Sequence, residues 1–346
     1  MSFSKAIPHE DALVNEFRKR LLAWYDVNAR DLPWRKDRDP YRVWISEIML
    51  QQTRVAAVID HYHGFLTRFP TVQKLAAARE ASVLSVWSGL GYYRRARMLH
   101  AAAKVVARER KGKFPETAEE WRSLQGIGRY TAAAIASIAF GDPTAVVDGN
   151  VERVLQRLSG RHFGGDEFWT SAESLLDRNR PGDFNQAMME LGATVCTPRA
   201  PLCLMCPVVE LCATRGKLAS ADRVKKQHKR QIDYALHRRD GEVFLVQRPR
   251  DARLMAGMWE LPEIGMPAVM KKLIPRSSRN HKSNGVAQTP LLSVRHSITV
   301  TEYTVRVWDC PPPETSSGEW IAIRRLSKIP LTGLARKVLR KAQVLG

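Results

Sequence analysis

The chain has 346 residues, enough for about two domains, and 44% of them are hydrophobic, which suffices for packed cores. Lysine and arginine number 55 against 35 acids, a formal net charge of +20. This excess argues against a metabolic enzyme with a neutral surface and favours a polyanionic partner, with a solvated basic surface that binds nothing as the alternative. No apolar run is long enough for a transmembrane helix, and the residues from Met1 to Arg20 lack the apolar centre of a signal peptide. We therefore expect a cytoplasmic protein.

Residues 11–215 are predicted to be almost continuously helical, with breaks at short glycine and proline motifs. Thr117 and Glu120 follow a proline in the capping-box pattern and predict one helix start. Residues 217–230 carry six lysines and arginines against one acid, which fits an exposed linker and fits a solvated helix face equally well.

Beyond residue 232 the pattern changes. Residues 243–246 and 299–308 favour β-branched and aromatic side chains, which predicts strands, and residues 334–344 predict a closing helix. The fold class is therefore a mainly α N-terminal domain followed by an α+β C-terminal domain.

Four of the five cysteines share the spacing C-x6-C-x2-C-x5-C, namely Cys196, Cys203, Cys206 and Cys212. Four thiolates in one loop need a cation, and soft sulfur suits zinc or an iron–sulfur centre. Structural zinc more often uses two C-x2-C pairs, and only Cys203 and Cys206 form one here. The spacing favours iron–sulfur and leaves zinc open, while Cys310 is predicted to be an ordinary thiol.

A glycine-rich turn lies between two predicted helices. Gly126 and Gly128 lie in the sequence Leu-Gln-Gly-Ile-Gly-Arg-Tyr that ends at Tyr130. The helix that follows such a turn presents free N–H groups that can hold a DNA phosphate, although most Gly-x-Gly turns are only turns.

Two carboxylates stand in apolar surroundings. Glu47 would have a raised pKa if buried and would then suit general acid catalysis, whereas a surface glutamate paired with Arg54 is the alternative. Asp148 follows an apolar run and precedes a glycine, which predicts a helix N-cap that does not exclude a catalytic role. Cleavage of a glycosidic bond uses two such groups, one that donates a proton and one that stabilises the oxocarbenium-like sugar.

Together, the cysteine loop, the glycine turn and residues 147–151 resemble the endonuclease III superfamily of helix–hairpin–helix glycosylases. Within it, residues 32–35, 46–53 and 89–97 resemble the MutY branch, the adenine-specific mismatch glycosylases. The resemblance implies a glycosylase domain over residues 1–216, with a six-helix module and a [4Fe–4S] cluster held by the four cysteines. A basic linker over 217–231 and a lesion-recognition domain over 232–346 would follow.

The resemblance also assigns roles. Glu47 would protonate adenine, Asp148 would stabilise the cationic sugar, and Tyr130 and Asn150 would position the acid and the water. Lyases of the superfamily carry lysine where Tyr130 stands, and a phenol cannot form a Schiff base, so the resemblance implies a monofunctional hydrolase.

Further residues are implied as DNA contacts. Gln52 and Tyr92 would enter the base stack while adenine is flipped out. The remaining implied contacts are Arg35, Gly126 and Gly128.

The C-terminal part resembles the Nudix-like domain with which this family recognises 8-oxoguanine. Residues 247–249 and 254–262 match its opening, but the glutamate-rich Nudix box is missing after Gly265, so neither a Mg²⁺ site nor pyrophosphatase activity is expected. The family's Phe-Ser-His loop corresponds here to residues 294–297. His296 fits and Arg295 replaces the serine, which leaves Ser297 as the substitute contact.

The sequence thus predicts a monomeric bacterial enzyme, associated with the nucleoid through DNA, that hydrolytically removes adenine mispaired with 8-oxoguanine or guanine. A thymine-mismatch or oxidised-pyrimidine glycosylase of the same superfamily is one alternative, against which Tyr130 and the long C-terminal domain argue. A non-catalytic cluster-bearing DNA-binding or redox-sensing protein is another, against which Glu47 and Asp148 argue.

Overall fold

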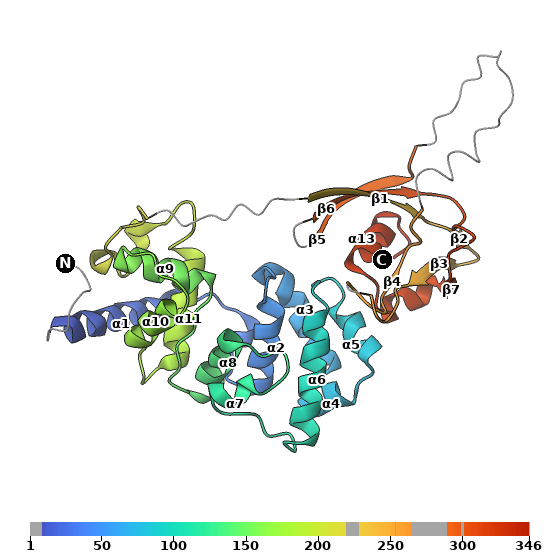
Figure 1. Ribbon diagram of the computed structural model, residues 1–346. Coiled ribbons are helices and arrows are strands. Elements are labelled where there is room, and N and C mark those ends of the chain that lie inside the picture. Colours follow the sequence, from blue (N-terminus) through green and yellow to red (C-terminus); the bar gives the residue numbers. More distant parts are fainter. Residues whose placement is uncertain (1–8, 219–227, 253, 265–288, 299–300, 346) are drawn as a thin grey trace, which may run out of the picture. The chain divides into compact units, whose positions relative to one another are not determined.

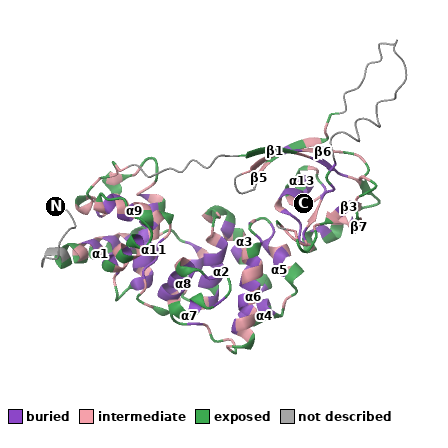
Figure 2. Cartoon of the chain, in the orientation of Figure 1, coloured by how far each residue is buried: buried purple, intermediate pink, exposed green. Residues whose placement is uncertain are grey.

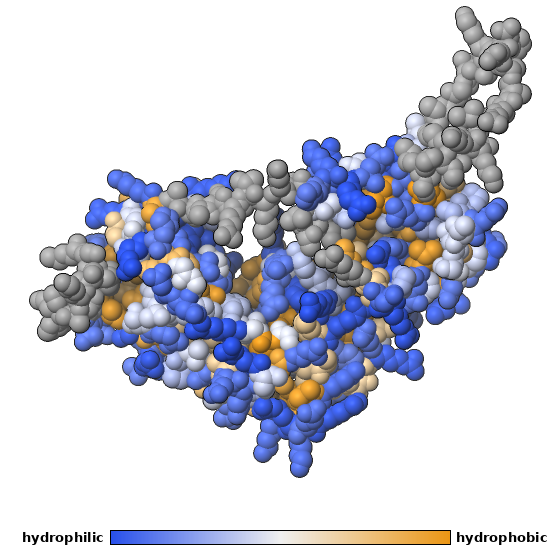
Figure 3. Space-filling model, viewed as in Figure 1, coloured by the Kyte–Doolittle hydropathy of each residue, from blue (hydrophilic) through white to orange (hydrophobic). Residues whose placement is uncertain are grey.

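The computed structural model describes residues 9–218, 228–252, 254–264, 289–298 and 301–345 (Figure 1). The chain divides into two compact units, one within residues 1–77 and 98–222, the other within 78–97 and 223–346. Hydrophilic residues cover most of the visible face of each unit, as the high net charge requires (Figure 3). Within the described parts of the chain, no helix is both long and apolar enough to cross a membrane.

The first unit is helical. Its α-helices are α1 (His9–Asn28), α2 (Pro40–Leu50), α3 (Val55–Arg68), α4 (Val72–Ala77), α6 (Arg94–Arg108, which begins in the second unit), α7 (Ala118–Arg122), α8 (Arg129–Ile135), α9 (Gly149–Ser159), α10 (Glu167–Leu175) and α11 (Pro181–Thr194). Shorter turns are η1 (Pro33–Arg35), the π-helical η2 (Ala136–Phe140), η3 (Cys203–Met205) and η4 (Val209–Leu211). The predicted mainly α N-terminal domain is confirmed.

Local capping and burial explain where these helices begin. Asp39 accepts the Arg42 N–H at the start of α2, and Thr117 accepts the Glu120 N–H at the start of α7, as the capping pattern predicted. Helix α2 is buried along most of its length (Figure 2). Helices α1, α9, α10 and α11 enclose an apolar core in which Phe17 and Phe184 meet edge to face, with ring centroids 6.2 Å apart.

The second unit is built on two small sheets. Its elements are α5 (Glu80–Trp87), β1 (His228–Ala235), β2 (Arg238–Arg239), β3 (Glu242–Gln247), β4 (Trp259–Glu260), β5 (Leu292–Ile298), β6 (Thr301–Trp308), β7 (Gly318–Ala322), η5 (Ile323–Lys328) and α13 (Gly333–Lys341). One sheet has the order β1–β6–β5, with β1 and β6 parallel and β5 and β6 antiparallel. In the other, β3 pairs with β2, β4 and β7. The predicted strands correspond to β3 and β6, and the predicted closing helix to α13.

Two boundaries differ from the sequence prediction. Strand β1 begins at His228, inside the predicted linker 217–231, because its backbone pairs with β6 although its first side chains are polar and exposed. Residues 219–227, the centre of that linker, lie outside the described residues. Residues 78–97, predicted within the helical domain, group instead with the second unit. There Ser88 donates to the Leu331 carbonyl at 2.8 Å, and Ser85 to the Ser327 carbonyl at 3.1 Å.

Candidate active site

The first unit contains a cavity of about 560 Å³ lined by η1, α2, the start of α8, the start of α9 and α11. Of the residues predicted from the sequence, those that line it are Arg35, Glu47, Gln52, Gly128, Tyr130, Asp148 and Asn150. Segments far apart in the chain therefore bring the two predicted carboxylates into one pocket.

Glu47 projects from α2 and is only 5% exposed, which excludes the alternative of a surface glutamate. Burial raises the pKa of its carboxyl to about 7. The hydrogen bond from Tyr130 opposes this rise, the negative charge of Asp148 adds to it, and the charge of Arg35 opposes it. A carboxyl with a pKa near neutrality can hold a proton and still release it, which suits a general acid.

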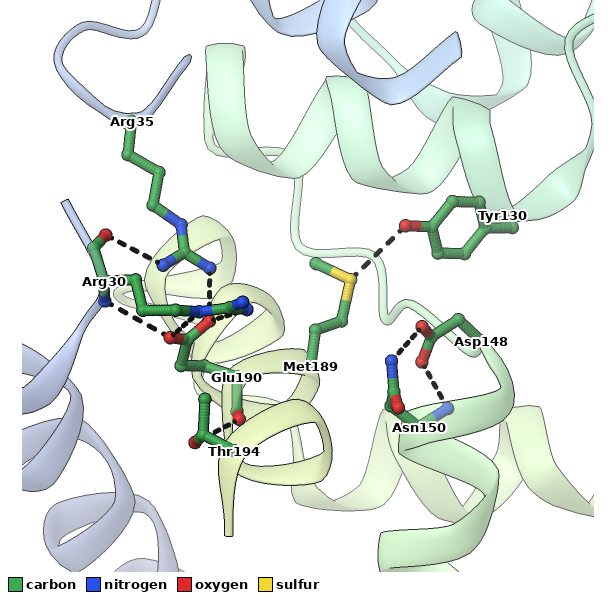
Figure 4. Close-up of polar contacts among 8 residues, drawn as sticks. All are labelled: Arg30, Arg35, Tyr130, Asp148, Asn150, Met189, Glu190 and Thr194. Carbon is green, nitrogen blue, oxygen red and sulfur yellow. Dashed lines mark hydrogen bonds and ion pairs between the residues drawn. The ribbon is translucent and has the colours of Figure 1, made fainter. Parts of the chain in front are cut away.

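Tyr130 lies in the first turn of α8, directly after the glycine turn. Its hydroxyl donates to Glu47 Oε2 at 3.0 Å. The same hydroxyl lies 3.4 Å from the sulfur of Met189 (Figure 4). Burial and the nearby carboxylates raise the pKa of Tyr130 well above its ordinary value. The phenol therefore stays protonated and acts as a fixed donor toward Glu47.

Asp148 is the N-cap of α9, as predicted, and it lines the cavity at the same time. Its carboxylate accepts the backbone N–H and the side-chain amide of Asn150, both at 2.9 Å (Figure 4). It also accepts the backbone N–H of Val151 at 2.8 Å. Three N–H donors hold the negative group in one orientation. The two predicted carboxylates thus have different environments, as glycosidic cleavage requires.

The opposite wall carries a charged cluster that the sequence analysis missed. Glu190, on α11, is 1% exposed and accepts from Arg30 at 2.6 and 2.8 Å and from Arg35 at 2.9 Å (Figure 4). Burial alone would raise the pKa of Glu190, but the hydrogen bonds of the two arginines outweigh it and lower that pKa. Arg35, predicted as a DNA contact, is thus placed in the pocket wall with a side chain 14% exposed. Glu190 is an acid in an apolar helix, as Glu47 is, but no local pattern specifies its pairing with Arg30, which lies 160 positions away.

The glycine turn and the two predicted intruding residues have special backbone conformations. Gly126 has a φ of +84°, and an added Cβ would lie 2.6 Å from Met98 Cβ, so only glycine fits. Gln52 and Tyr92 have φ values of 56° and 47°, which non-glycine residues seldom adopt, and both side chains are exposed. Such conformations concentrate at functional sites.

The four cysteines of the predicted cluster lie near one another beside the α9–α11 core. Burial raises the pKa of Cys206 to about 11, and the charges of the other three cysteines add to this rise. The guanidinium of Arg157 lies 3.5 Å from Cys196 Sγ, and Arg153 joins the Cys196 carbonyl to the Asn150 side chain with bonds of 2.7 and 2.9 Å. Among the described residues, no group of three or more His, Cys, Asp or Glu side chains is arranged to hold a single metal ion. The donor set itself, four clustered soft thiols beside a cation, fits an iron–sulfur centre.

The predicted lesion-reading residues lie in the second unit, on β5. His296 is partly buried, and burial and the charge of Lys337 lower its pKa, so its imidazole is neutral at pH 7. Ser297 is exposed, and so is Arg295, whose carbonyl accepts from Lys337 Nζ at 2.6 Å.

Comparison with family models identifies both parts of the chain. Residues 45–164 match the HhH-GPD superfamily of base excision DNA repair proteins, and residues 234–341 match the NUDIX domain. These matches and the strands of the second unit confirm the predicted combination of a helix–hairpin–helix domain with a Nudix-like domain.

Two curated relatives that the chain resembles are adenine DNA glycosylases. The adenine DNA glycosylase of Homo sapiens is 52% identical over 224 residues, which cover 60% of this chain and 41% of the human protein. That of Mus musculus is 42% identical over 335 residues, which cover 78% of this chain and 63% of the mouse protein. The chain therefore spans less than two thirds of the length of these relatives.

Solved structures resemble the helical part. A thermostable thymine-DNA glycosylase is 30% identical with a TM-score of 0.56, and the match covers 60% of this chain and 99% of that one. Endonuclease III in a non-covalent DNA complex is 22% identical with a TM-score of 0.53, covering 61% and 98%, and shows a shared fold.

Proposed function

Because the chain belongs to the HhH-GPD superfamily of base excision DNA repair proteins, we propose that it is a monofunctional adenine DNA glycosylase. It would hydrolytically remove adenine mispaired with 8-oxoguanine, or with guanine, from duplex DNA. The observation that carries the proposal is Glu47, a buried carboxyl with a pKa of about 7 that faces a cavity shared with Asp148. The names of the curated relatives support adenine as the base.

The geometry supports a two-carboxylate mechanism. Glu47 gives its proton to a ring nitrogen of the flipped adenine, so the base can leave with the electron pair of the bond to the sugar. Asp148, fixed by its three N–H donors, stabilises the positive charge that develops on the sugar. A water oxygen then bonds to the sugar carbon that held the base and passes a proton to the Glu47 carboxylate, which leaves a hydroxyl in place of the base and restores the acid. Tyr130 holds Glu47, and Asn150 positions the water.

Tyr130 also supports hydrolysis over lyase chemistry. Its side chain has no amine, so it cannot form an imine with the sugar, and no covalent intermediate is expected there. Borohydride treatment during turnover would leave no stoichiometric protein–DNA adduct. A stoichiometric adduct would contradict the monofunctional assignment.

Other residues have supporting roles in the proposal. Gln52 and Tyr92 would fill the base stack, Gly126 and Gly128 would admit a phosphate, and His296 with Ser297 would contact 8-oxoguanine. The four clustered cysteines would hold a [4Fe–4S] cluster that fixes the loop they form. Arg35 would stay bound to Glu190 at the pocket wall. The protein would act as a monomer.

Release of the free base tests the function directly. The full chain is incubated with four duplexes that differ in one base pair. The first three place adenine opposite 8-oxoguanine, guanine and thymine in turn, and the fourth places thymine opposite guanine. We expect free adenine from the first two and no base from the others. Release of thymine from its mismatch would favour the thymine-specific alternative, and binding without release of any base would favour the non-catalytic one.

A further inference from the structure

A groove of about 460 Å³ lies in the second unit, and none of its lining residues lines the catalytic cavity. It is formed by α13, which packs beside β4 and β5, and by the loop that follows α5. The lining residues of this α13 groove are Gly89, Gly333, Arg336, Lys337, Arg340 and Lys341. Two glycines and four cations make it a strongly positive surface without a lining acid.

The sequence of α13 places these cations on one side. Its apolar residues at 334, 335, 338 and 339 are buried in the core of the second unit, so the basic residues at 336, 337, 340 and 341 point away from that core. Like charges three to four residues apart repel, which makes the pattern unfavourable for helix stability alone. Burial lowers the pKa of Arg336, and the charge of Arg340 adds to this fall.

Neutral partners hold the cations without cancelling their charge. Arg336 Nε donates to Ser88 Oγ at 2.9 Å, Lys337 Nζ to the Arg295 carbonyl at 2.6 Å, and Lys341 Nζ to the Ser293 carbonyl at 2.9 Å. Among the residues that the structure describes, none of the four groove cations forms an ion pair with a carboxylate. The positive charge is therefore positioned and available to a ligand.

Each of the two lining glycines is close, in the chain or in space, to a residue predicted to contact DNA. Gly89 begins the loop that leads to Tyr92, a side chain 43% exposed on left-handed backbone. Gly333 lies against His296, whose ring is 3.9 Å from where a Cβ of residue 333 would stand. Within this one unit, the groove is thus lined by a glycine three residues from the predicted wedge and by a glycine in contact with the predicted lesion reader.

We propose that the α13 groove binds the phosphodiester backbone of duplex DNA, which would anchor the second unit on the strand next to the lesion. The proposal deepens the proposed function and rests on it for the identity of the polyanion. Residues 336 and 340 are about 6 Å apart along the helix axis, which is close to two nucleotide steps of about 3.4 Å along the duplex, so cations one helical turn apart can face phosphates of one strand. The lining offers no aromatic ring on which the base of a free nucleotide would stack.

Two double variants with equal change in charge test the groove. Arg340→Gln/Lys341→Gln removes two exposed groove cations, whereas Arg238→Gln/Arg324→Gln removes two exposed cations that do not line it. The affinity of each full-length protein for an undamaged duplex is measured by fluorescence anisotropy over a series of salt concentrations. Each phosphate contact contributes about 0.9 to the slope of log K against log salt, so the groove variant should lose about 1.8.

The control should keep nearly the whole slope, and Arg340→Lys/Lys341→Arg, which retains the charge, should restore it. Equal slopes for the groove and control variants would overturn the proposal. It would also be overturned if the groove variant lost binding of inorganic pyrophosphate while its DNA slope stayed unchanged. Because the duplex is undamaged, the slope does not depend on catalysis. If the parent protein released no adenine while the groove variant still had a lowered slope, the proposed enzyme would be contradicted and the groove would remain supported.

Discussion

Glu47 and Glu190 face the same cavity from helices α2 and α11 and are 5% and 1% exposed. Glu47 accepts a hydrogen bond from a neutral phenol, and its pKa rises to about 7. Glu190 accepts from two guanidinium groups, and its pKa falls below the ordinary value. Burial disfavours the ionised form of both, so the neighbours decide the outcome. A neutral donor leaves a transferable proton on one wall, and two fixed cations make a permanent carboxylate on the other.

The two carboxyls also change the stability of the fold with pH in opposite directions. Glu47 has a pKa above its unfolded value, so it favours the folded state below about pH 4.5 and that contribution is lost as the pH rises through about 7. Glu190 has a lowered pKa, so its contribution is present above its unfolded pKa and is lost as the pH falls through the folded one.

The largest expected effect follows from removing the transferable proton. Glu47→Gln keeps the size of the side chain but cannot act as an acid, so single-turnover adenine release should fall about 10²- to 10⁴-fold. Binding of the mismatched duplex should remain. Glu119→Gln, on an exposed glutamate of α7, is the matched control and should release adenine normally. Full activity in Glu47→Gln would remove Glu47 from the chemistry.

The sequence could predict one side of this comparison and not the other. Glu47, Tyr130 and Asp148 each stand in a short local motif, an apolar helix, a glycine turn and a cap, so each could be marked as a candidate. Their shared role was implied by the family resemblance, since the Tyr130–Glu47 bond itself joins residues 83 positions apart. The pair of Arg30 and Glu190 joins residues 160 positions apart, and no local pattern specifies it. The same limit applies to the fold, since Ser88 joins the second unit through a bond to a carbonyl 243 positions away.

Removing the fixed carboxylate should affect folding more than a surface pair does. Glu190→Gln leaves Arg30 and Arg35 without their anion in a partly buried wall, and the free energy of unfolding should fall by about 3 kcal/mol, the lower end for a broken buried pair because Arg30 is 40% exposed. Urea unfolding of the whole protein measures it. Arg38→Gln, which breaks an exposed pair with Asp183, should change it by less than about 1 kcal/mol. Equal losses in the two variants would show that the cluster does not stabilise the fold.

The opposite sign is expected for Glu47. A carboxyl whose pKa rises from 4.5 to about 7 destabilises the ionised folded protein by up to about 3 kcal/mol. Glu47→Gln removes that penalty, so the inactive variant should unfold at higher urea concentration than the parent at pH 8. The gain should shrink as the pH is lowered from 7 and vanish below about 4.5. A gain that is constant over this range would show that it does not arise from the ionisation of Glu47.

The smallest effect concerns the neutral donor that distinguishes the two walls. Tyr130→Phe removes the hydrogen bond that favours the ionised form of Glu47, so the pKa of Glu47 should rise further. Adenine release needs the protonated acid, and its rate in the parent should therefore decline above about pH 7. In Tyr130→Phe this decline should begin at higher pH, whereas Tyr303→Phe in the second unit should leave the profile unchanged. A decline at unchanged or lower pH would mean that Tyr130 does not set the ionisation of Glu47. The difference between the raised pKa of Glu47 and the lowered pKa of Glu190, whose charge is fixed by arginines, would then not be explained by the nature of the hydrogen-bond donor.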